Sequence, residues 1–171
     1  MHAYVFISYS RNDVAFITPI VRLLRTAIAG VSSASGNQWK LVFQDIDNID
    51  PGGEWEKKID EAIARAERMF VFWCTHSATS NQVRREYELG FQLAKVVVPV
   101  LLDDTPLPAD LSRINGVDLR GLRVHGPQLR QLIPDLGVRS PREVIIREFA
   151  QALDMDAQSM DLNLIRSVLG H

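Results

Sequence analysis

Two short stretches of the chain are apolar at nearly every position, and they constrain the fold more than any other feature. Residues 69–74 read MFVFWC, and residues 96–102 read VVVPVLL. A strand with one face in solvent alternates apolar and polar residues, whereas a strand covered by helices on both faces does not. The two stretches therefore predict central strands of a sheet that lies between two layers of helices.

Three further stretches predict the rest of a parallel sheet. They are residues 3–8, 39–43 and, more weakly, 117–119. Segments with apolar residues at helical spacing occur at residues 14–28, 54–68, 80–93 and 141–153. Asn12 or Asp13 can cap the first of these helices, and Ser80 or Asn81 can cap the third. Strands that alternate with helices in this way are typical of α/β proteins with a parallel sheet.

The length and composition suit one ordinary domain. The chain has 171 residues, of which 46% are hydrophobic and 23% are charged. A chain of this length buries about two-thirds of its unfolded surface. We expect one domain at residues 1–153, followed by a tail at residues 154–171 that forms a docking helix or a linker.

Charge and cysteine content exclude several classes of function. The formal net charge of -2, with no run of lysine or arginine, gives no basic surface for nucleic acid. No apolar stretch is long enough to cross a bilayer, so no membrane partner is expected. Cys74 is the only cysteine, so no intrachain disulfide can form, and we expect a reducing, cytoplasmic location.

The sequence carries no pattern for a metal or a bound cofactor. The four histidines are scattered without metal-ligand spacing, and neither GxGxxG nor a Walker loop occurs. Cys74 and His76 lie close together at the end of a predicted strand, which raises the hypothesis of a cysteine nucleophile. A buried free cysteine is more commonly a small apolar core residue, and we favour that interpretation.

Polar residues follow the first two predicted strands. In a parallel sheet, ligands bind in the crevice beyond the carboxyl ends of the strands. The first strand ends in FISYSRND at residues 6–13, and the second leads to Asp45 and then to IDPGGEW at residues 49–55. A third segment, VRRE at residues 83–86, opens a predicted helix. Together and in this order, the three segments resemble those of the TIR (Toll/interleukin-1 receptor) domain family, bacterial type.

This resemblance implies a TIR fold, a flavodoxin-like three-layer sandwich with a central parallel sheet of about five strands. It implies that Glu86 is the catalytic residue of an NAD-cleaving enzyme, with NAD as substrate and no cofactor. It further implies that the BB loop, from Ile46 to Gly53, mediates self-association with other TIR domains. Immune-type signalling or defence is the expected setting.

The resemblance also assigns five residues to substrate binding: Ser8, Ser10, Arg11, Asp45 and Trp55. On this interpretation, phosphate or ribose is bound by Ser8, Ser10 and Arg11. The alternative interpretation is that these residues only form a capped turn into the first helix. Trp55 is either a flat surface for a ring of NAD or a core aromatic residue. Asp45 more readily organises the BB loop through backbone N–H groups than contacts the substrate.

Cleavage of the nicotinamide–ribose bond makes few demands on the protein. One carboxylate that stabilises a cation-like sugar supplies the main electrostatic effect. Two alternatives stay open at this point. Gln82 replaces a tryptophan that NAD-cleaving members often carry, which favours a non-catalytic TIR–TIR interaction module. A nucleoside-processing glycosyl transferase would also use a glutamate against a ribosyl cation.

Overall fold

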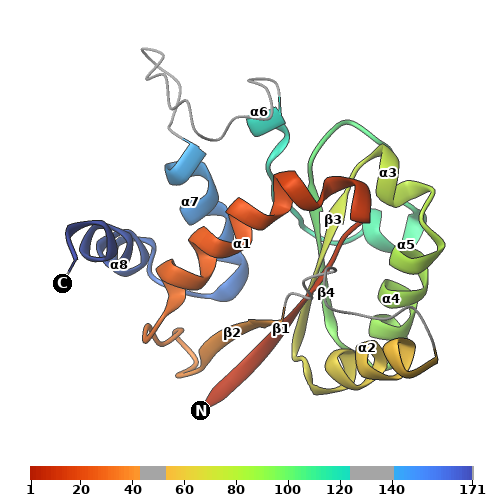
Figure 1. Ribbon diagram of the computed structural model, residues 1–171, viewed down its shortest axis with the longest axis horizontal. Coiled ribbons are helices and arrows are strands. Elements are labelled where there is room, and N and C mark those ends of the chain that lie inside the picture. The colour runs from red at the N-terminus through yellow and green to blue at the C-terminus, as the bar shows by residue number, and fades with distance from the viewer. Residues whose placement is uncertain (43–52, 124–140, 171) are drawn as a thin grey trace.

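A five-stranded parallel sheet forms the centre of the protein, with its strands in the order β2-β1-β3-β4-β5 (Figure 1). The computed structural model describes residues 1–42, 53–123 and 141–170. The strands are β1 (His2–Ser8), β2 (Gln38–Val42), β3 (Arg68–Trp73), β4 (Val96–Leu101) and β5 (Val117–Asp118). The five predicted strands and the α/β class are therefore confirmed.

Helices cover both faces of this sheet and make three layers (Figure 1). One layer contains α1 (Val14–Ile28), α7 (Pro141–Leu153) and α8 (Ala157–Leu169). The other contains α2 (Gly53–Arg65) and α4 (Asn81–Gln92). Short helices occupy the connections: η1 (Arg11–Asp13), α3 (Thr75–Ala78), α5 (Ala109–Ser112) and α6 (Arg120–Arg123).

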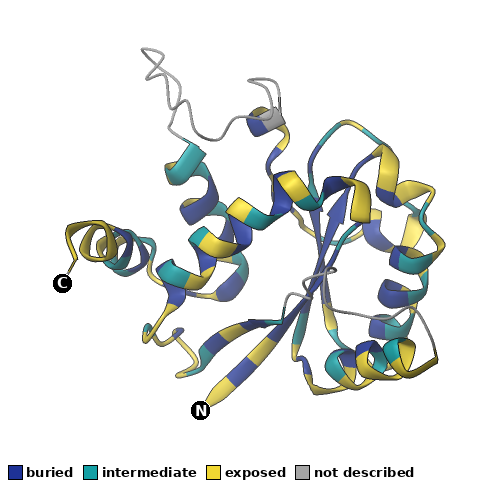
Figure 2. Ribbon diagram, viewed as in Figure 1, coloured by how far each residue is buried: buried dark blue, intermediate teal, exposed yellow. Residues whose placement is uncertain are grey.

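The alternation of side chains along β3 divides the core into two clusters. Phe70 and Phe72 pack in the cluster under α1 and α7, where the ring of Phe149 lies edge-on to Phe70 at 5.0 Å. Met69 and Val71 pack in the cluster under α2 and α4. Both faces of β3 are buried, as Figure 2 shows. The absence of polar alternation in this strand follows from its double burial.

The end of α7 is joined to the sheet through two side chains from different strands. Trp39 on β2 donates its indole N–H to the carbonyl oxygen of Leu153 at 2.9 Å. Arg68 on β3 donates to the carbonyl oxygen of Ala152, and its guanidinium lies 5.0 Å from the centre of the Trp39 ring. A cation beside the last carbonyl groups of a helix also interacts favourably with the helix dipole.

One sequence-based boundary was wrong, and one expected capping side chain has other partners. The helix expected at residues 54–68 ends at Arg65, because Arg68 already belongs to β3 and pairs with Val96. The side chain of Asp13 makes no capping hydrogen bond to α1, because its carboxylate contacts Cys74 and His76 instead. Ser80, by contrast, caps α4 as expected and accepts a hydrogen bond from the N–H of Val83 at 3.2 Å.

Residues 157–169 form a helix that packs on α1 and α7. Met160 and Leu164 of α8 are buried in the core. Asn163 donates its side-chain amide to the carbonyl oxygens of Ala27 and Ala29, at 3.1 and 2.8 Å, and so satisfies the end of α1. The domain boundary after residue 153 stays a prediction. In the described ranges, no helix is long and apolar enough to span a membrane.

The connection into β5 contains a glycine that cannot be replaced without strain. A Cβ atom at Gly116 would lie 2.6 Å from the carbonyl oxygen of Pro99 in β4. We therefore expect Gly116→Ala to lower the free energy of unfolding by about 1–3 kcal/mol, the usual cost of overpacking. Urea denaturation measures this difference.

Gly121→Ala is the matched control for that variant. A Cβ atom there has no described heavy atom within 4 Å outside its chain neighbours and its own helix backbone. Its effect should stay within about 0.5 kcal/mol, as for ordinary surface substitutions. Equal effects of the two variants would contradict the close approach at Gly116.

Candidate functional site

The connections between strands change direction between β1 and β3. From β1 the chain passes to β2 on one side, and from β3 it passes to β4 on the other side. In open parallel sheets the crevice at such a switch point is where ligands bind. Ser8 is the last residue of β1, and Cys74 directly follows β3, so both lie at this crevice.

Glu86 is a buried carboxylate at the same place. Glu86 is 5% exposed and lies in the second turn of α4. Ser8 donates its hydroxyl to Oε2 at 2.5 Å, and Gln82 donates its side-chain amide to Oε1 at 2.7 Å. Both oxygens of the carboxylate are thus held by neighbouring side chains, one from β1 and one from the preceding turn of α4.

The local sequence explains why Glu86 faces inward. Capping by Ser80 sets the start of α4, and Val83 and Tyr87 then form the buried stripe of the helix. Glu86 lies three residues after Val83, so it shares this stripe. Ser8 points to the same side because it shares a face of β1 with Phe6, which packs in the cluster under α2 and α4.

Burial changes the acidity of Glu86. Removal of the carboxylate from water raises its pKa, and this effect outweighs the hydrogen bonds from Ser8 and Gln82. The charges of Arg85 and Arg11 also act to lower the pKa but do not restore its ordinary value. Among the described residues, no lysine or arginine forms an ion pair with Glu86; Arg85 instead pairs with Asp60 at 2.5 Å.

Arg11, whose charge acts on this carboxylate, lies against Trp55. The guanidinium carbon of Arg11 is 5.1 Å from the centre of the Trp55 ring. Trp55 belongs to α2 and is half-buried against the core cluster of that layer. The pair combines a positive charge with a flat apolar surface, and the two residues come from different elements, η1 and α2.

The structure thus brings four of the six predicted site residues into one group: Ser8, Arg11, Trp55 and Glu86. Ser10 has a different contact, since its side chain accepts a weak 3.4 Å hydrogen bond from the N–H of Asn12 and caps η1. Asp45 lies outside the described residues, as does most of the segment from Ile46 to Gly53.

Gln82 also belongs to the site, although the sequence analysis did not identify it as a partner of Glu86. The signal was present, because residues four apart on a helix lie one above the other and an amide can donate to a carboxylate there. Gln82 therefore places a hydrogen-bond donor directly on Glu86.

Cys74 is fully buried, and its thiol donates to Oδ2 of Asp13 at 2.8 Å. Burial raises the pKa of this thiol, and the hydrogen bond to Asp13 raises it further. A nucleophilic cysteine needs a lowered pKa and contact with a base. The carboxylate of Asp13 contacts both Cys74 and the imidazole of His76, so the geometry opposes the nucleophile hypothesis.

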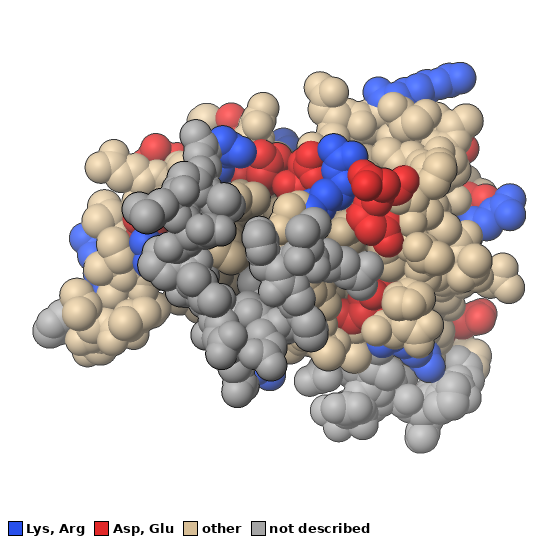
Figure 3. Space-filling view, turned by 90° about the horizontal axis from the view of Figure 1, so that it is seen from above, with Lys and Arg blue, Asp and Glu red and all other residues tan. Residues whose placement is uncertain are grey.

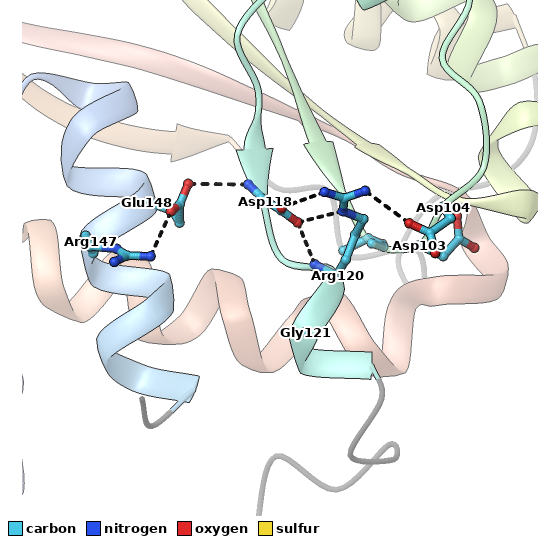
Figure 4. A pocket seen from close by; sticks show the side chains of 8 residues that line it. Asp103, Asp104, Asp118, Arg120, Gly121, Arg147 and Glu148 are labelled. Atoms are coloured by element: carbon cyan, nitrogen blue, oxygen red, sulfur yellow. Dashed lines mark hydrogen bonds and ion pairs between the residues drawn. The ribbon is translucent and has the colours of Figure 1, made fainter. Parts of the chain in front are cut away.

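A separate pocket of about 610 Å³ lies at the carboxyl ends of β4 and β5 (Figure 4). Arg120 is at its centre and pairs with Asp118 at 2.9 Å and with Asp104 at 3.0 Å. Figure 3, which looks onto this end of the molecule, shows acidic and basic side chains interleaved. Exposed pairs of this kind each contribute about 0–1 kcal/mol, and Glu86 does not line the pocket.

Comparison with known proteins gives a family and a fold. The model of the TIR domain family matches residues 5–133, more than half of the chain. Comparison with curated proteins gave no significant match.

Among solved structures, the TIR domain of the Toll-related receptor TRR-2 from Hydra magnipapillata is similar in fold. Its TM-score is 0.51, at 21% identity over 71% of this chain and 87% of that chain. The TIR domains of the activated Roq1 resistosome match with a TM-score of 0.48, at 17% identity over 73% of this chain and 92% of that chain. A flavodoxin-like domain from Synechococcus sp. matches with a TM-score of 0.45, at 13% identity over 98% of this chain and 99% of that chain.

The match to the family model covers the end of β1, η1, α2 and α4, and with them Ser8, Arg11, Trp55 and Glu86. On this evidence, the chain belongs to the TIR domain family.

Proposed function

We propose that this TIR domain cleaves the bond between nicotinamide and ribose in NAD, with Glu86 as the catalytic residue. The products are nicotinamide and ADP-ribose or a cyclic variant of it. One observation carries the proposal: a buried carboxylate at the switch point of the sheet, held by Ser8 and Gln82 and grouped with Arg11 and Trp55. Functional groups with perturbed pKa values in a crevice are candidates for catalysis.

The electrostatics of the site suit this reaction. As the glycosidic bond breaks, positive charge develops on the ribose, and a fixed carboxylate beside it lowers the energy of the transition state. The effect is larger in a buried site than in water, because the surrounding medium screens the charge less. The hydrogen bonds from Ser8 and Gln82 fix the two oxygens of Glu86 in advance.

The reaction does not need a general acid. The nicotinamide of NAD is a pyridinium, and it departs as a neutral molecule when it takes the bonding electron pair. Each oxygen of Glu86 keeps a lone pair with which it can accept a hydrogen bond from a ribose hydroxyl. Ser8 and Gln82 are then positioning residues rather than participants in bond cleavage.

Arg11 and Trp55 are suited to bind the rest of the substrate. A guanidinium binds phosphate through charge-assisted hydrogen bonds, and an indole ring stacks on a flat heterocycle. Their mutual contact at 5.1 Å puts the two functions next to each other. We propose that this pair holds the pyrophosphate and one ring of NAD. Asp45 is assigned to the BB loop on the family resemblance alone.

A non-catalytic interaction module is the second candidate function. It is favoured by the fact that both oxygens of Glu86 are already hydrogen-bonded within the chain, as a purely structural carboxylate would be. Both candidates include self-association through the segment from Ile46 to Gly53. The single cysteine is the basis for placing either function in the cytoplasm.

Glu86→Gln tests the catalytic assignment. The substitution removes the negative charge and keeps nearly the same shape, so the fold should persist and NAD cleavage should fall at least a hundredfold. That fall corresponds to about 3 kcal/mol in the transition state. Release of nicotinamide from NAD by concentrated protein is the measurement.

Glu88→Gln is the control, because Glu88 is exposed and pairs only with Arg84 on the same helix among the described residues. Its activity should match that of the wild type. If the wild type releases no nicotinamide, the interaction module is supported. Cleavage of nucleosides but not of NAD would select a glycosyl transferase.

The raised pKa of Glu86 predicts a specific dependence of stability on pH. Between its pKa in the unfolded chain and its higher pKa in the folded chain, the folded chain holds a proton that the unfolded chain has lost. The free energy of unfolding of the wild type therefore falls as pH rises through this window. Glu86→Gln lacks this loss, so its stability relative to the wild type should rise over the same window and then level off.

Urea denaturation from mildly acidic to neutral pH measures that difference, and it does not depend on enzyme activity. A difference between Glu86→Gln and the wild type that stays constant over this range would contradict the raised pKa of Glu86.

Self-association should couple to activity. On the sequence, we expect Pro51 and Gly52 to let the loop before α2 project and present Ile49 to a neighbouring copy. Activity per molecule of the wild type should rise with protein concentration. Ile49→Asp should remove this rise because it places a charge in the contact, whereas Ile49→Val should keep it. Activity per molecule that is constant across concentrations in all three proteins would exclude assembly-dependent catalysis.

A further inference from the structure

Three side chains that commonly bind metal ions converge at the end of β3, outside the Glu86 site. Asp13 comes from η1, Cys74 directly follows β3, and His76 lies in α3. Their ligand atoms all lie within 4.8 Å of one another. We propose that Asp13, Cys74 and His76 bind a transition-metal ion of the zinc type.

The arrangement centres on the carboxylate of Asp13. Its Oδ2 is 2.8 Å from Sγ of Cys74, and its Oδ1 is 2.9 Å from Nδ1 of His76. Only one residue separates Cys74 from His76 in the sequence. In the turn from β3 into α3, both side chains therefore point toward the carboxylate of Asp13. Three elements thus place a sulfur, a nitrogen and an oxygen ligand around one point.

The three side chains differ in burial, so the proposed metal site is shielded from solvent on one side and accessible on the other. Asp13 is 2% exposed and Cys74 is fully buried, whereas the side chain of His76 is 47% exposed. The buried pair is pre-positioned by the core, and an ion can approach from the side of the imidazole. A pre-positioned ligand set with an entry path is what a metal site requires.

The donor set selects the kind of ion. Calcium and magnesium prefer oxygen ligands alone, so a thiolate and an imidazole count against them. Zinc accepts cysteine, histidine and aspartate together, usually in a tetrahedron. Three protein ligands leave the fourth position for water or another small ligand, which is the layout of zinc sites with an open coordination position.

Binding would replace the two hydrogen bonds with metal–ligand bonds. With zinc–ligand distances of about 2.0–2.3 Å, ligand atoms in a tetrahedron are about 3.5 Å apart, so the carboxylate of Asp13 must move away from Sγ and Nδ1 by roughly half an ångström or slightly more. The thiol proton passes to solvent. The imidazole binds through Nδ1 as the neutral form with its proton on Nε2, so a proton that Nδ1 shares with Asp13 in the metal-free chain also leaves this nitrogen. Ser77, whose Oγ lies 3.6 Å from Sγ of Cys74, would then hydrogen-bond to the thiolate.

The test is a titration of the full, metal-free chain with Co²⁺ alone, followed by absorption spectroscopy. One Co²⁺ per chain should bind with a thiolate-to-cobalt charge-transfer band in the near ultraviolet, and Zn²⁺ should abolish this band by displacement. Changes around metal ligands commonly cost about 10–100-fold in affinity, so His76→Gln should weaken binding at least tenfold. Cys74→Ser should remove the charge-transfer band.

His2→Gln is the control, because His2 is exposed and begins β1 at the opposite end of the sheet. It should bind Co²⁺ as the wild type does. Cys74 is buried, so Cys74→Ser can fail to fold. His76→Gln then still tests the proposal, because the side chain of His76 is half-exposed and its replacement should leave the fold intact. The proposal is overturned if the wild type shows no charge-transfer band, or if His76→Gln binds Co²⁺ with wild-type affinity. Neither readout depends on NAD cleavage.

Discussion

The reversal of direction between β1 and β3 determines where the buried polar side chains of this protein gather. Every strand is parallel, so all strand ends meet at one edge of the sheet, and only at this reversal do the outgoing connections separate. Alternation along each strand then sends successive side chains to opposite layers. Ser8 faces the layer of α4 and meets Glu86, whereas Cys74 faces the layer of α1 and meets Asp13. One topological feature thus produces two distinct polar groups, back to back across the sheet.

Burial of a carboxylate is unfavourable for folding, and the structure shows how the cost is limited. Glu86 receives one neutral hydrogen bond on each oxygen and has no close cationic partner among the described residues. A close arginine would lower the pKa, but it would also cancel the negative charge that the proposed reaction requires. Neutral donors such as Ser8 and Gln82 orient the group and leave its charge available. Under the proposed function, this arrangement gives up some stability in favour of activity.

The sequence was sufficient for the layers and the strands, since both depend on patterns that repeat within a few residues. The continuous apolar residues of β3 and β4 indicate that both faces of these strands are buried. The position of Glu86 on a helix followed from the apolar spacing of residues 80–93, and its catalytic assignment followed from the family resemblance. The spacing of four residues made a contact with Gln82 possible, but the contact itself depends on how both side chains rotate. Asp13 shows the other limit. Its position favours helix capping, but a partner 61 residues away, Cys74, takes its carboxylate instead. Local rules fail where a distant group competes for the same atom.

The attachment of α7 to the sheet has a consequence for how the chain acquires its structure. Trp39 and Leu153 are 114 residues apart in sequence, and the bond between them joins the edge strand to the end of α7. Contacts of such long separation form late, because a long loop must close before they can contribute. During synthesis, β2 therefore emerges long before the helix that anchors its tryptophan. Until then the indole ring of Trp39 lacks its partner on α7, and a chaperone that shields exposed apolar side chains would act in this interval.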